Sequence, residues 1–442
     1  MKQYNKDLSF LSYVRNYSKT FKKVCFTAKS LYIRDKIRNS DNKVKTVWTI
    51  INGELGKIRS NDSTIKLVNS GRVIDKSADV ALAFEDFFSS VPASLTKNLN
   101  SSSALAESLL RDHVAECNKL FELRHVTADE IVKTFKTLNL KKTCDLWGMS
   151  VNLVNNIIEN IANQLAFIFN QCCDCGIFPD LLKFSKVIPL FKSGDQEDSN
   201  NYRPISILPT LSKVFEKLIL NQLNSHFASN GLLHAKQYGF TKGRSTTDAG
   251  VALLSHIYKA WENSKNALGI FCDLSKAFDC VEHSTLLRKL NFYGIKGLAQ
   301  DLIASYLQNR VQTVVVNGEK SRGAPINIGV PQGSILGPFL FLVYINDLPY
   351  YLQDMCEIVL FADDTSLIFN VDRHDTNVDE VNSALLRISN WFNANNLLLN
   401  TKKNKLCRIY PPKCKKGEKE YYFKRGGIIP CGIDCFSWFD IR

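Results

Sequence analysis

The chain has 442 residues, of which 45% are hydrophobic and 22% charged, so a large buried core is expected and a disordered chain is excluded. Lys and Arg (56) outnumber Asp and Glu (43), and the net charge of +13 suits nucleic acid or an anionic membrane surface, although a basic protein without such a partner can have the same composition. The odd number of cysteines (13), the absence of a secretory signal and the absence of an apolar run of ~18 residues exclude a disulfide-stabilised or membrane-spanning protein and predict an intracellular one.

The N-terminal third is predicted to be helical. Residues 1–120 are expected to form a helical N-terminal extension, whose first 45 or so residues are basic. Residues 121–175 form a second helical region, and Thr127 and Glu130 have the spacing of a capping box at the start of one helix. These elements are interpreted as structural rather than catalytic.

Residues 176–405 alternate between strands and helices. The patterns predict strands at 187–191, 267–272 and 311–316, and helices at 212–227, 339–345 and 378–392. Ser284 is expected to cap a further helix that ends near Gly294, and Asn317-Gly318 to form a hairpin turn. This mixture indicates an α+β fold rather than a regular series of parallel βαβ units.

A candidate catalytic site begins with two adjacent carboxylates. Apolar stretches on both sides of Asp363 and Asp364 predict a β-hairpin with this pair at its turn. The two charges repel each other unless a cation intervenes, although a hairpin turn also accepts Asp for its turn geometry alone. A buried strand carries Asp273 at its C-terminal end, and if it lies beside the hairpin the three carboxylates converge. Such oxygen ligands suit Mg²⁺, and two ions ~3.5–4 Å apart can promote in-line phosphoryl transfer.

Several sequence boxes resemble those of a known family. Phe361-Ala-Asp-Asp364 is similar to the F/Y-x-D-D box of reverse transcriptases. Further boxes stand in family order: Asn201-Tyr-Arg-Pro-Ile-Ser206, Gln237-Tyr-Gly-Phe240, Arg244-Ser-Thr246, Leu274-Ser-Lys-Ala-Phe-Asp279, Ser305-Tyr-Leu-Gln-Asn-Arg310, Gly329-Val-Pro-Gln-Gly-Ser-Ile-Leu-Gly-Pro338, Asn346-Asp-Leu-Pro349 and Trp391-Phe-Asn-Ala-Asn395. From about Trp48 to Lys405 the chain thus resembles the enzymes of jockey-like non-LTR retrotransposons of animals.

The resemblance implies an RNA-directed DNA polymerase with a right-hand fold. Fingers and palm would occupy residues 176–405, with an antiparallel palm sheet backed by helices, and residues 121–175 would lead into the fingers. The implied partners are an RNA template, a DNA primer and deoxynucleoside triphosphates, in the cytoplasm and nucleus, without a membrane. Two Mg²⁺ ions, with Mn²⁺ as an alternative, would be the cofactors. The oligomeric state stays open.

The resemblance also implies roles for single residues near the carboxylates. Asp273, Asp363 and Asp364 match the catalytic, metal-binding aspartates, and the backbone carbonyl of Leu274 would add a metal ligand. Phe278 matches the steric gate that rejects a 2′-hydroxyl, although a core phenylalanine is the usual alternative. Two residues of the loop before an apolar helix are implied as well, with a tight structural loop as the alternative: Gln332, which would contact the nucleotide, and Gly333, which would touch the template.

Basic residues are expected to bind phosphate. By resemblance, Lys192 and Arg203 would grip the triphosphate, and Lys403 would assist the pyrophosphate, although Asn404 follows it where the family usually has Thr. Lys242 and Arg244 lie in a small, polar segment that could contact a nucleic-acid backbone. The alternatives are solvated surface charges and, for the last segment, a plain turn.

The chain departs from the family at both ends. No endonuclease series of His, Asp and Glu precedes Phe121, and residues 406–442 form an off-pattern basic tail without a recognisable primer grip or thumb. We therefore expect a partial copy of such an element. The main alternative function is a catalytically inactive, nucleic-acid-binding remnant.

Overall fold

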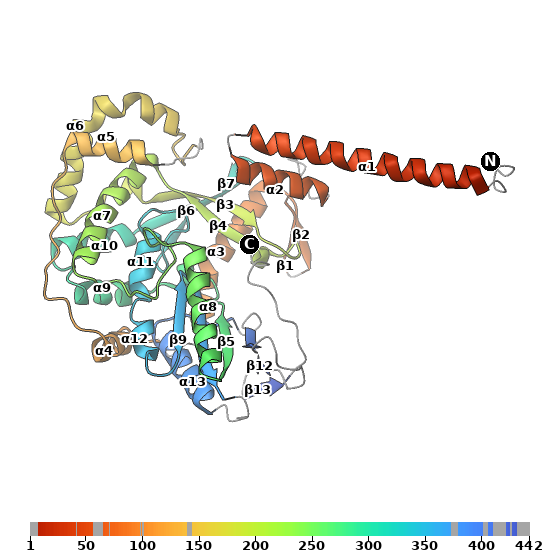
Figure 1. Ribbon diagram of the computed structural model, residues 1–442. Coiled ribbons are helices and arrows are strands. Elements are labelled where there is room, and N and C mark those ends of the chain that lie inside the picture. Colours follow the sequence, from red (N-terminus) through yellow and green to blue (C-terminus); the bar gives the residue numbers. More distant parts are fainter. Residues whose placement is uncertain are drawn as a thin grey trace. The chain divides into compact units, whose positions relative to one another are not determined.

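The computed structural model describes residues 8–40, 42–55, 65–69, 71–97, 99, 101–138, 144–372, 379–400, 405–409, 421–424 and 427–430. The chain divides into two compact units, residues 1–64 and 65–442. The first unit contains two helices, α1 (Leu8–Arg38) and α2 (Lys43–Glu54), drawn in red in Figure 1. The unit boundary falls inside the predicted extension 1–120, and the domain limits predicted at residues 120, 175 and 405 stay predictions.

The second unit mixes helices and strands. Its helices are α3 (Ser77–Thr96), α4 (Ser103–His113), α5 (Ala128–Thr137), α6 (Val151–Cys175), α7 (Thr210–Ser229), α8 (Thr246–Glu262), α9 (His283–Phe292), α10 (Leu298–Leu307), α11 (Gly337–Tyr344), α12 (Leu348–Leu352) and α13 (Asp379–Ala394). Its strands are β1 (Leu67–Asn69), β2 (Arg72–Ile74), β3 (Phe184–Phe191), β4 (Tyr202–Ile207), β5 (Asn266–Cys272), β6 (Arg310–Val316), β7 (Glu319–Lys320), β8 (Ala324–Ile326), β9 (Glu357–Phe361), β10 (Asp364–Val371), β11 (Lys405–Ile409), β12 (Tyr421–Lys424) and β13 (Gly427–Pro430). The mixed helix-and-sheet fold agrees with the prediction.

This unit contains a four-stranded antiparallel sheet in the order β11-β5-β10-β9. Strand β5 is buried on both faces, which explains its continuous apolar run. On one face Ala267 packs with Leu253 and Ile257 of α8, the helix that crosses the sheet in Figure 1. On the other face Leu268 and Ile270 join the main core, which α9, α11 and α13 also line.

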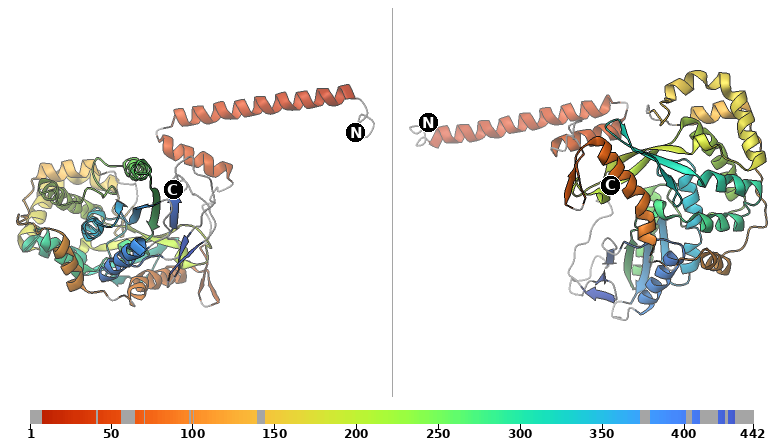
Figure 2. Two further views of the ribbon diagram at one scale, coloured as in Figure 1. Left: turned by 60° about the horizontal axis from the view of Figure 1, so that its bottom comes forward. Right: turned by 180° about the vertical axis from the view of Figure 1, so that it is seen from behind.

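A second sheet in the order β4-β3-β6-β7, with β8 paired to β6, has a small core of its own. Strands β3 and β6 run parallel, and the other pairs are antiparallel. Helix α3, orange in Figure 2, buries Val80 and Phe84 together with Val187 of β3 and Val314 of β6. Segments far apart in the sequence thus stabilise the β3–β4 hairpin.

Local signals in the sequence predict several element ends. Thr127 and Glu130 form the predicted capping box at α5. Asn317 (φ 51°) and Gly318 (φ 91°) form the predicted turn between β6 and β7, since such two-residue hairpin turns need positive φ. Within the described residues, no helix is long and apolar enough to cross a membrane.

The predicted cap of α9 is wrong. The helix begins at His283, two residues earlier than a cap at Ser284 would allow, and Glu282 is the cap. The Glu282 carboxylate accepts the backbone N–H groups of Ser284 (3.2 Å) and Thr285 (2.6 Å). Its longer, charged side chain therefore satisfies two N–H groups of the first turn, and Ser284 lies inside the helix. The helix ends at Phe292, close to Gly294 as predicted.

Candidate functional site

The adjacent carboxylates lie at the tip of the β9–β10 hairpin. Phe361 pairs with Asp364, which leaves Ala362 and Asp363 as the two turn residues. Ala362 has φ 57°, a left-handed conformation that residues with a Cβ rarely adopt. Asp363 is half-buried and Asp364 is exposed. This strained turn fixes where the two carboxylates leave the sheet, so its neighbours must hold it in place.

The segment that contains Gln237 and Gly239 supports this turn. The Gln237 side-chain Oε1 accepts the backbone N–H of Gly239 (2.8 Å) and the N–H of Ala362 (3.0 Å). The Tyr238 N–H donates to the Leu360 carbonyl (2.8 Å), so the segment runs beside β9 as an added strand-like edge. Gln237 is 3% exposed, which makes this contact part of the core behind the hairpin.

The third carboxylate follows the neighbouring strand. Cys272 of β5 pairs with Thr365 of β10, so the next residue pair in this register is Asp273 and Asp364. Asn400 holds Asp273 through two hydrogen bonds. Its backbone N–H donates to the Asp273 carbonyl (2.8 Å), and its side-chain Nδ2 donates to the Asp273 carboxylate (2.9 Å). The structure therefore brings the backbones of all three predicted aspartates to one end of the sheet.

The donor chemistry of the three aspartates suits a hard divalent cation such as Mg²⁺. Within the described ranges, however, no three His, Cys, Asp or Glu side chains are grouped closely enough to hold a metal ion. The strand register nevertheless places the backbone positions of the three aspartates next to one another.

Phe278 lies beside this end of the sheet and is tightly held. Its ring stacks on Phe341 of the buried helix α11, with ring centroids 4.5 Å apart, and meets Phe240 edge-on at 6.3 Å. Its backbone carbonyl accepts the N–H of Val330 (2.8 Å). The side chain is half-buried. A rigid aromatic wall with one accessible side results.

The loop with Gln332 and Gly333 joins strand β4 to the 3₁₀ turn Ala277–Cys280. The Gln332 side-chain amide donates to the Asp279 carboxylate (2.8 Å), and its carbonyl accepts the N–H of Ser206 in β4 (2.8 Å). Burial raises the pKa of Asp279 to about 6, although the Gln332 hydrogen bond and Lys276 oppose the shift. Gly333 has φ 126° and lies so close to the Ser206 carbonyl that a side chain would overlap it.

Lys192 and Arg203 lie on the β3–β4 hairpin. Arg203 pairs with Leu190, and the Lys192 N–H donates to the Asn201 carbonyl (2.8 Å), two residues further along. Because side chains alternate along a strand, Lys192 and Arg203 leave the same face of the hairpin. Lys192 is exposed and Arg203 half-buried.

Of the other basic candidates, Lys242 and Arg244 lie in a loop, and Lys403 is not among the described residues. Lys242 is exposed in the loop that follows Phe240. The Arg244 guanidinium donates to the carbonyls of Ala235 and Gln237 (3.1 Å to the latter) and lies 5.0 Å from the Tyr238 ring centroid, so it also closes its own loop.

No pattern in the sequence predicts a role for Gln237 or Asn400, the side chains that hold the hairpin and Asp273, respectively. Gln237 lies in the box Gln237-Tyr-Gly-Phe240, which was its only signal, and Asn400 lies outside every box that was quoted. Their partners are 125 and 127 residues away, and no local pattern predicts such contacts.

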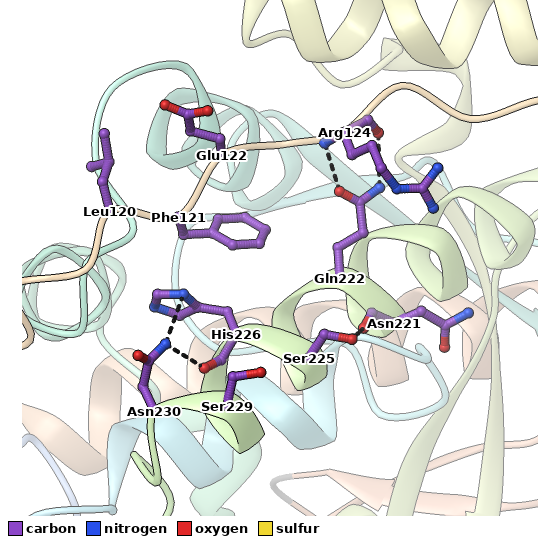
Figure 3. A pocket seen from close by; sticks show the side chains of 10 residues that line it. All are labelled: Leu120, Phe121, Glu122, Arg124, Asn221, Gln222, Ser225, His226, Ser229 and Asn230. Atoms are coloured by element: carbon purple, nitrogen blue, oxygen red, sulfur yellow. Dashed lines mark hydrogen bonds between the residues drawn. The ribbon is translucent and has the colours of Figure 1, made fainter.

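A separate pocket of about 470 Å³ lies between α7 and the segment 120–124 (Figure 3). Gln222 pairs with the Arg124 backbone through its side-chain amide, accepting at 2.7 Å and donating at 3.0 Å. The His226 ring contacts the Tyr293 carbonyl (2.9 Å). None of the predicted site residues lines this pocket.

Comparisons with known proteins fit this geometry. Residues 192–423 match the family described as reverse transcriptase (RNA-dependent DNA polymerase). Three Drosophila melanogaster proteins are similar: the probable RNA-directed DNA polymerase from transposon BS (32% identity, 56% of this chain and 28% of the relative), the RNA-directed DNA polymerase from mobile element jockey (33%, 56% and 28%) and the probable RNA-directed DNA polymerase from transposon X-element (30%, 55% and 27%). The chain thus spans less than a third of the length of these relatives.

Proposed function

Because the chain belongs to the reverse transcriptase (RNA-dependent DNA polymerase) family, we propose that it copies RNA into DNA by adding deoxynucleotides to a primer 3′ end. One observation carries the proposal: the register of β5, β10 and β9 brings Asp273, Asp363 and Asp364 to one end of one sheet. The similar proteins extend the proposal to a jockey-like non-LTR retrotransposon.

The proposed architecture is a right hand. The antiparallel sheet β11-β5-β10-β9 would be the palm, and the β3–β4 hairpin with β6 would belong to the fingers, within residues 176–405. The helical extension would precede them. Of residues 406–442, the structure describes 406–409, 421–424 and 427–430.

The proposed catalytic residues are the three aspartates. With the Leu274 carbonyl, they would hold two Mg²⁺ ions, or Mn²⁺ instead. Bound there, the ions would lower the pKa of the primer 3′-hydroxyl and stabilise the charge of the triphosphate and its leaving group. The protein itself would contribute the positions of the aspartates. Gln237 holds the strained turn and Asn400 holds Asp273, so the backbone would need little reorganisation during the reaction.

Selection of the nucleotide would depend on Phe278. A ring stacked on Phe341 cannot retreat without breaking that contact, so it would exclude a 2′-hydroxyl by overlap. Gln332 would contact the incoming nucleotide. Lys192 and Arg203, which leave one face of the hairpin, would bind the triphosphate, with Lys403 at the pyrophosphate.

Template and primer would lie along two loops, the one that contains Lys242 and Arg244 and the one that contains Gln332 and Gly333. Lys242 would contact a phosphate of the strand, Arg244 would do so while it closes its own loop, and Gly333 would allow the template close to the backbone. RNA template, DNA primer and deoxynucleoside triphosphates are the proposed partners. A protein that is made in the cytoplasm and synthesises DNA at a chromosomal site would act in both the cytoplasm and the nucleus.

The experiment is primer extension on an RNA template with Mg²⁺ and deoxynucleotides. We compare the natural chain with the double variant Asp363→Ala, Asp364→Ala and with Asp354→Ala, an exposed aspartate in the turn that precedes the other end of β9. Extension by the natural chain and by Asp354→Ala, and its loss in the double variant, would support the proposal.

The alternative function is a catalytically inactive, nucleic-acid-binding remnant. It predicts a folded chain that binds primer–template with the same affinity in all three proteins and extends none. That result would reject polymerase activity and direct attention to the tail after Lys405.

A further inference from the structure

Helix α1 carries an unusual exposed apolar stripe. Seven of its residues follow one another at alternating spacings of four and three: Phe10, Val14, Tyr17, Phe21, Val24, Ala28 and Leu31. We call these seven residues the seam. Its six large members are each 40% to 62% exposed, and Ala28 is exposed as well.

The spacing of the seam identifies the kind of surface that fits it. An average period of 3.5 residues is the coiled-coil period, whereas a helix that packs on a globular core follows 3.6 residues and a wider face. The seam spans three heptads, about the minimum that a coiled coil needs. Two of its aromatic members, Tyr17 and Phe21, stack with ring centroids 6.5 Å apart.

The charges of α1 are arranged around the seam. Five basic residues lie on the side away from it: Arg15, Lys19, Lys22, Lys23 and Lys29. The positions that flank the seam are uncharged: Leu11, Tyr13, Ser18, Thr20, Cys25 and Thr27. Flanking charges usually set the partner of a coiled coil, and like charges there would repel an identical helix. Here none opposes self-association.

The other helix of this unit leaves the seam open. Helix α2 folds back along the C-terminal part of α1, where Lys29 pairs with Glu54 (2.6 Å). The half-buried residues Ile33 and Ile37 lie on the side of α1 opposite the seam, and this second face is the one that α2 occupies. The hairpin therefore does not use the seam.

We propose that α1 forms a two-stranded coiled coil with a second copy of this chain, through the seam. The partner is an identical chain because an identical seam matches the heptad spacing and brings no charge against it. The basic residues then point outward from the pair, where they would face nucleic acid. This proposal does not depend on polymerase activity.

The test is sedimentation equilibrium of the full chain over a range of concentrations. Phe21→Asp places a charge in the seam, and Phe26→Asp is its matched control: Phe26 is 77% exposed and lies about 140° around the helix from Phe21. We expect dimers for the natural chain and for Phe26→Asp, and at least tenfold weaker dimerisation for Phe21→Asp. The thermal unfolding of the second unit should be the same in all three.

A variant that should strengthen dimerisation controls for the possibility that Phe21→Asp loses dimerisation only because it misfolds. Ala28→Leu enlarges the smallest side chain of the seam without a helix-breaking residue, and should tighten the dimer severalfold. A natural chain that stays monomeric, or equal dimerisation of Phe21→Asp and Phe26→Asp, would overturn the proposal. Monomers that bind phosphatidylserine vesicles through Phe21 would overturn it too, and would assign the seam to a membrane surface.

Discussion

Gly239 shows at the scale of one residue how closely the carboxylate hairpin is supported. A Cβ at this position would overlap the backbone of Phe361 and Ala362, at the strained turn that carries Asp363. No other residue type fits between the supporting segment and the hairpin. The glycine therefore belongs to the machinery that positions the carboxylates, although it carries no chemistry of its own.

We predict that Gly239→Ala lowers primer extension by about tenfold or more, because the turn must shift away, and destabilises the protein by ~1–3 kcal/mol. Gly250 is the matched control: it lies in α8, and a Cβ there meets nothing within 4 Å. Gly250→Ala should keep full extension and gain about 0.5–1 kcal/mol of stability. Equal extension by the two variants would show that the hairpin does not need this contact.

The Asp279 carboxyl gives a prediction for pH. Its pKa is raised by burial to about 6, so the folded state binds a proton that the unfolded state has already released. Stability from this group is present below about pH 4 and is lost as the pH rises to about 6. Asp279→Asn keeps the oxygen that accepts from Gln332 and removes the charge.

Asp279→Asn should therefore be more stable than the natural chain at pH 7.5 and show no such advantage at pH 4. The upper limit is about 3 kcal/mol at ~1.4 kcal/mol per unit of pKa shift, reduced because part of the side chain still meets solvent. Urea unfolding at both pH values measures it. A difference between the two proteins that is the same at both pH values would contradict the assigned pKa.

At the scale of elements, the start of α9 allows two candidate capping residues to be compared. Glu282 accepts two backbone N–H groups, whereas Ser284, the residue that the sequence suggested, lies inside the helix. We predict that Glu282→Ala costs about 1–2 kcal/mol, since it leaves the first turn unsatisfied. Ser284→Ala should cost clearly less. Thermal unfolding compares them, and a larger loss for Ser284→Ala would restore the sequence-based cap.

The positions of the strands along the chain were easier to predict than the pairing of one strand with another. The run at 267–272, the hairpin at 358–369 and the turn at Asn317-Gly318 are each dictated by a few adjacent residues, and the structure contains all three. The sequence did not show that β11 pairs with β5, or that the strand-like edge at Gln237 runs beside β9. Pairings of this kind depend on which strands share a core, which no local pattern records.

At the scale of the molecule, one buried ion pair joins four helices. The Lys289 ammonium of α9 donates to the Asp347 carboxylate (2.6 Å) before α12 and to the Tyr344 carbonyl (2.7 Å) of α11. The indole N–H of Trp391 in α13 donates to the other Asp347 oxygen (2.8 Å). Both charged side chains are 1% exposed.

We predict that Lys289→Met alone costs ~3–5 kcal/mol, because it leaves a buried carboxylate without its cation. The double variant Lys289→Met, Asp347→Leu should recover most of that loss, since neither buried charge remains. Urea unfolding of the two single variants and the double variant gives the coupling. Additive losses would show that the two side chains act independently.

The sequence by itself determined several of the secondary-structure elements of this protein and the positions of the three aspartates along the chain. Propensity, turn residues and capping act over a few neighbouring residues, so β5, the β9–β10 hairpin and the carboxylate positions follow from local patterns. Only the tertiary structure decided how they meet. Gln237 and Asn400 reach the hairpin and Asp273 across more than 120 residues, and the loop at Gly333 packs on Ser206 of another sheet. Such contacts are fixed by packing of the whole core, because a side chain's partner depends on every segment that shares the space around it.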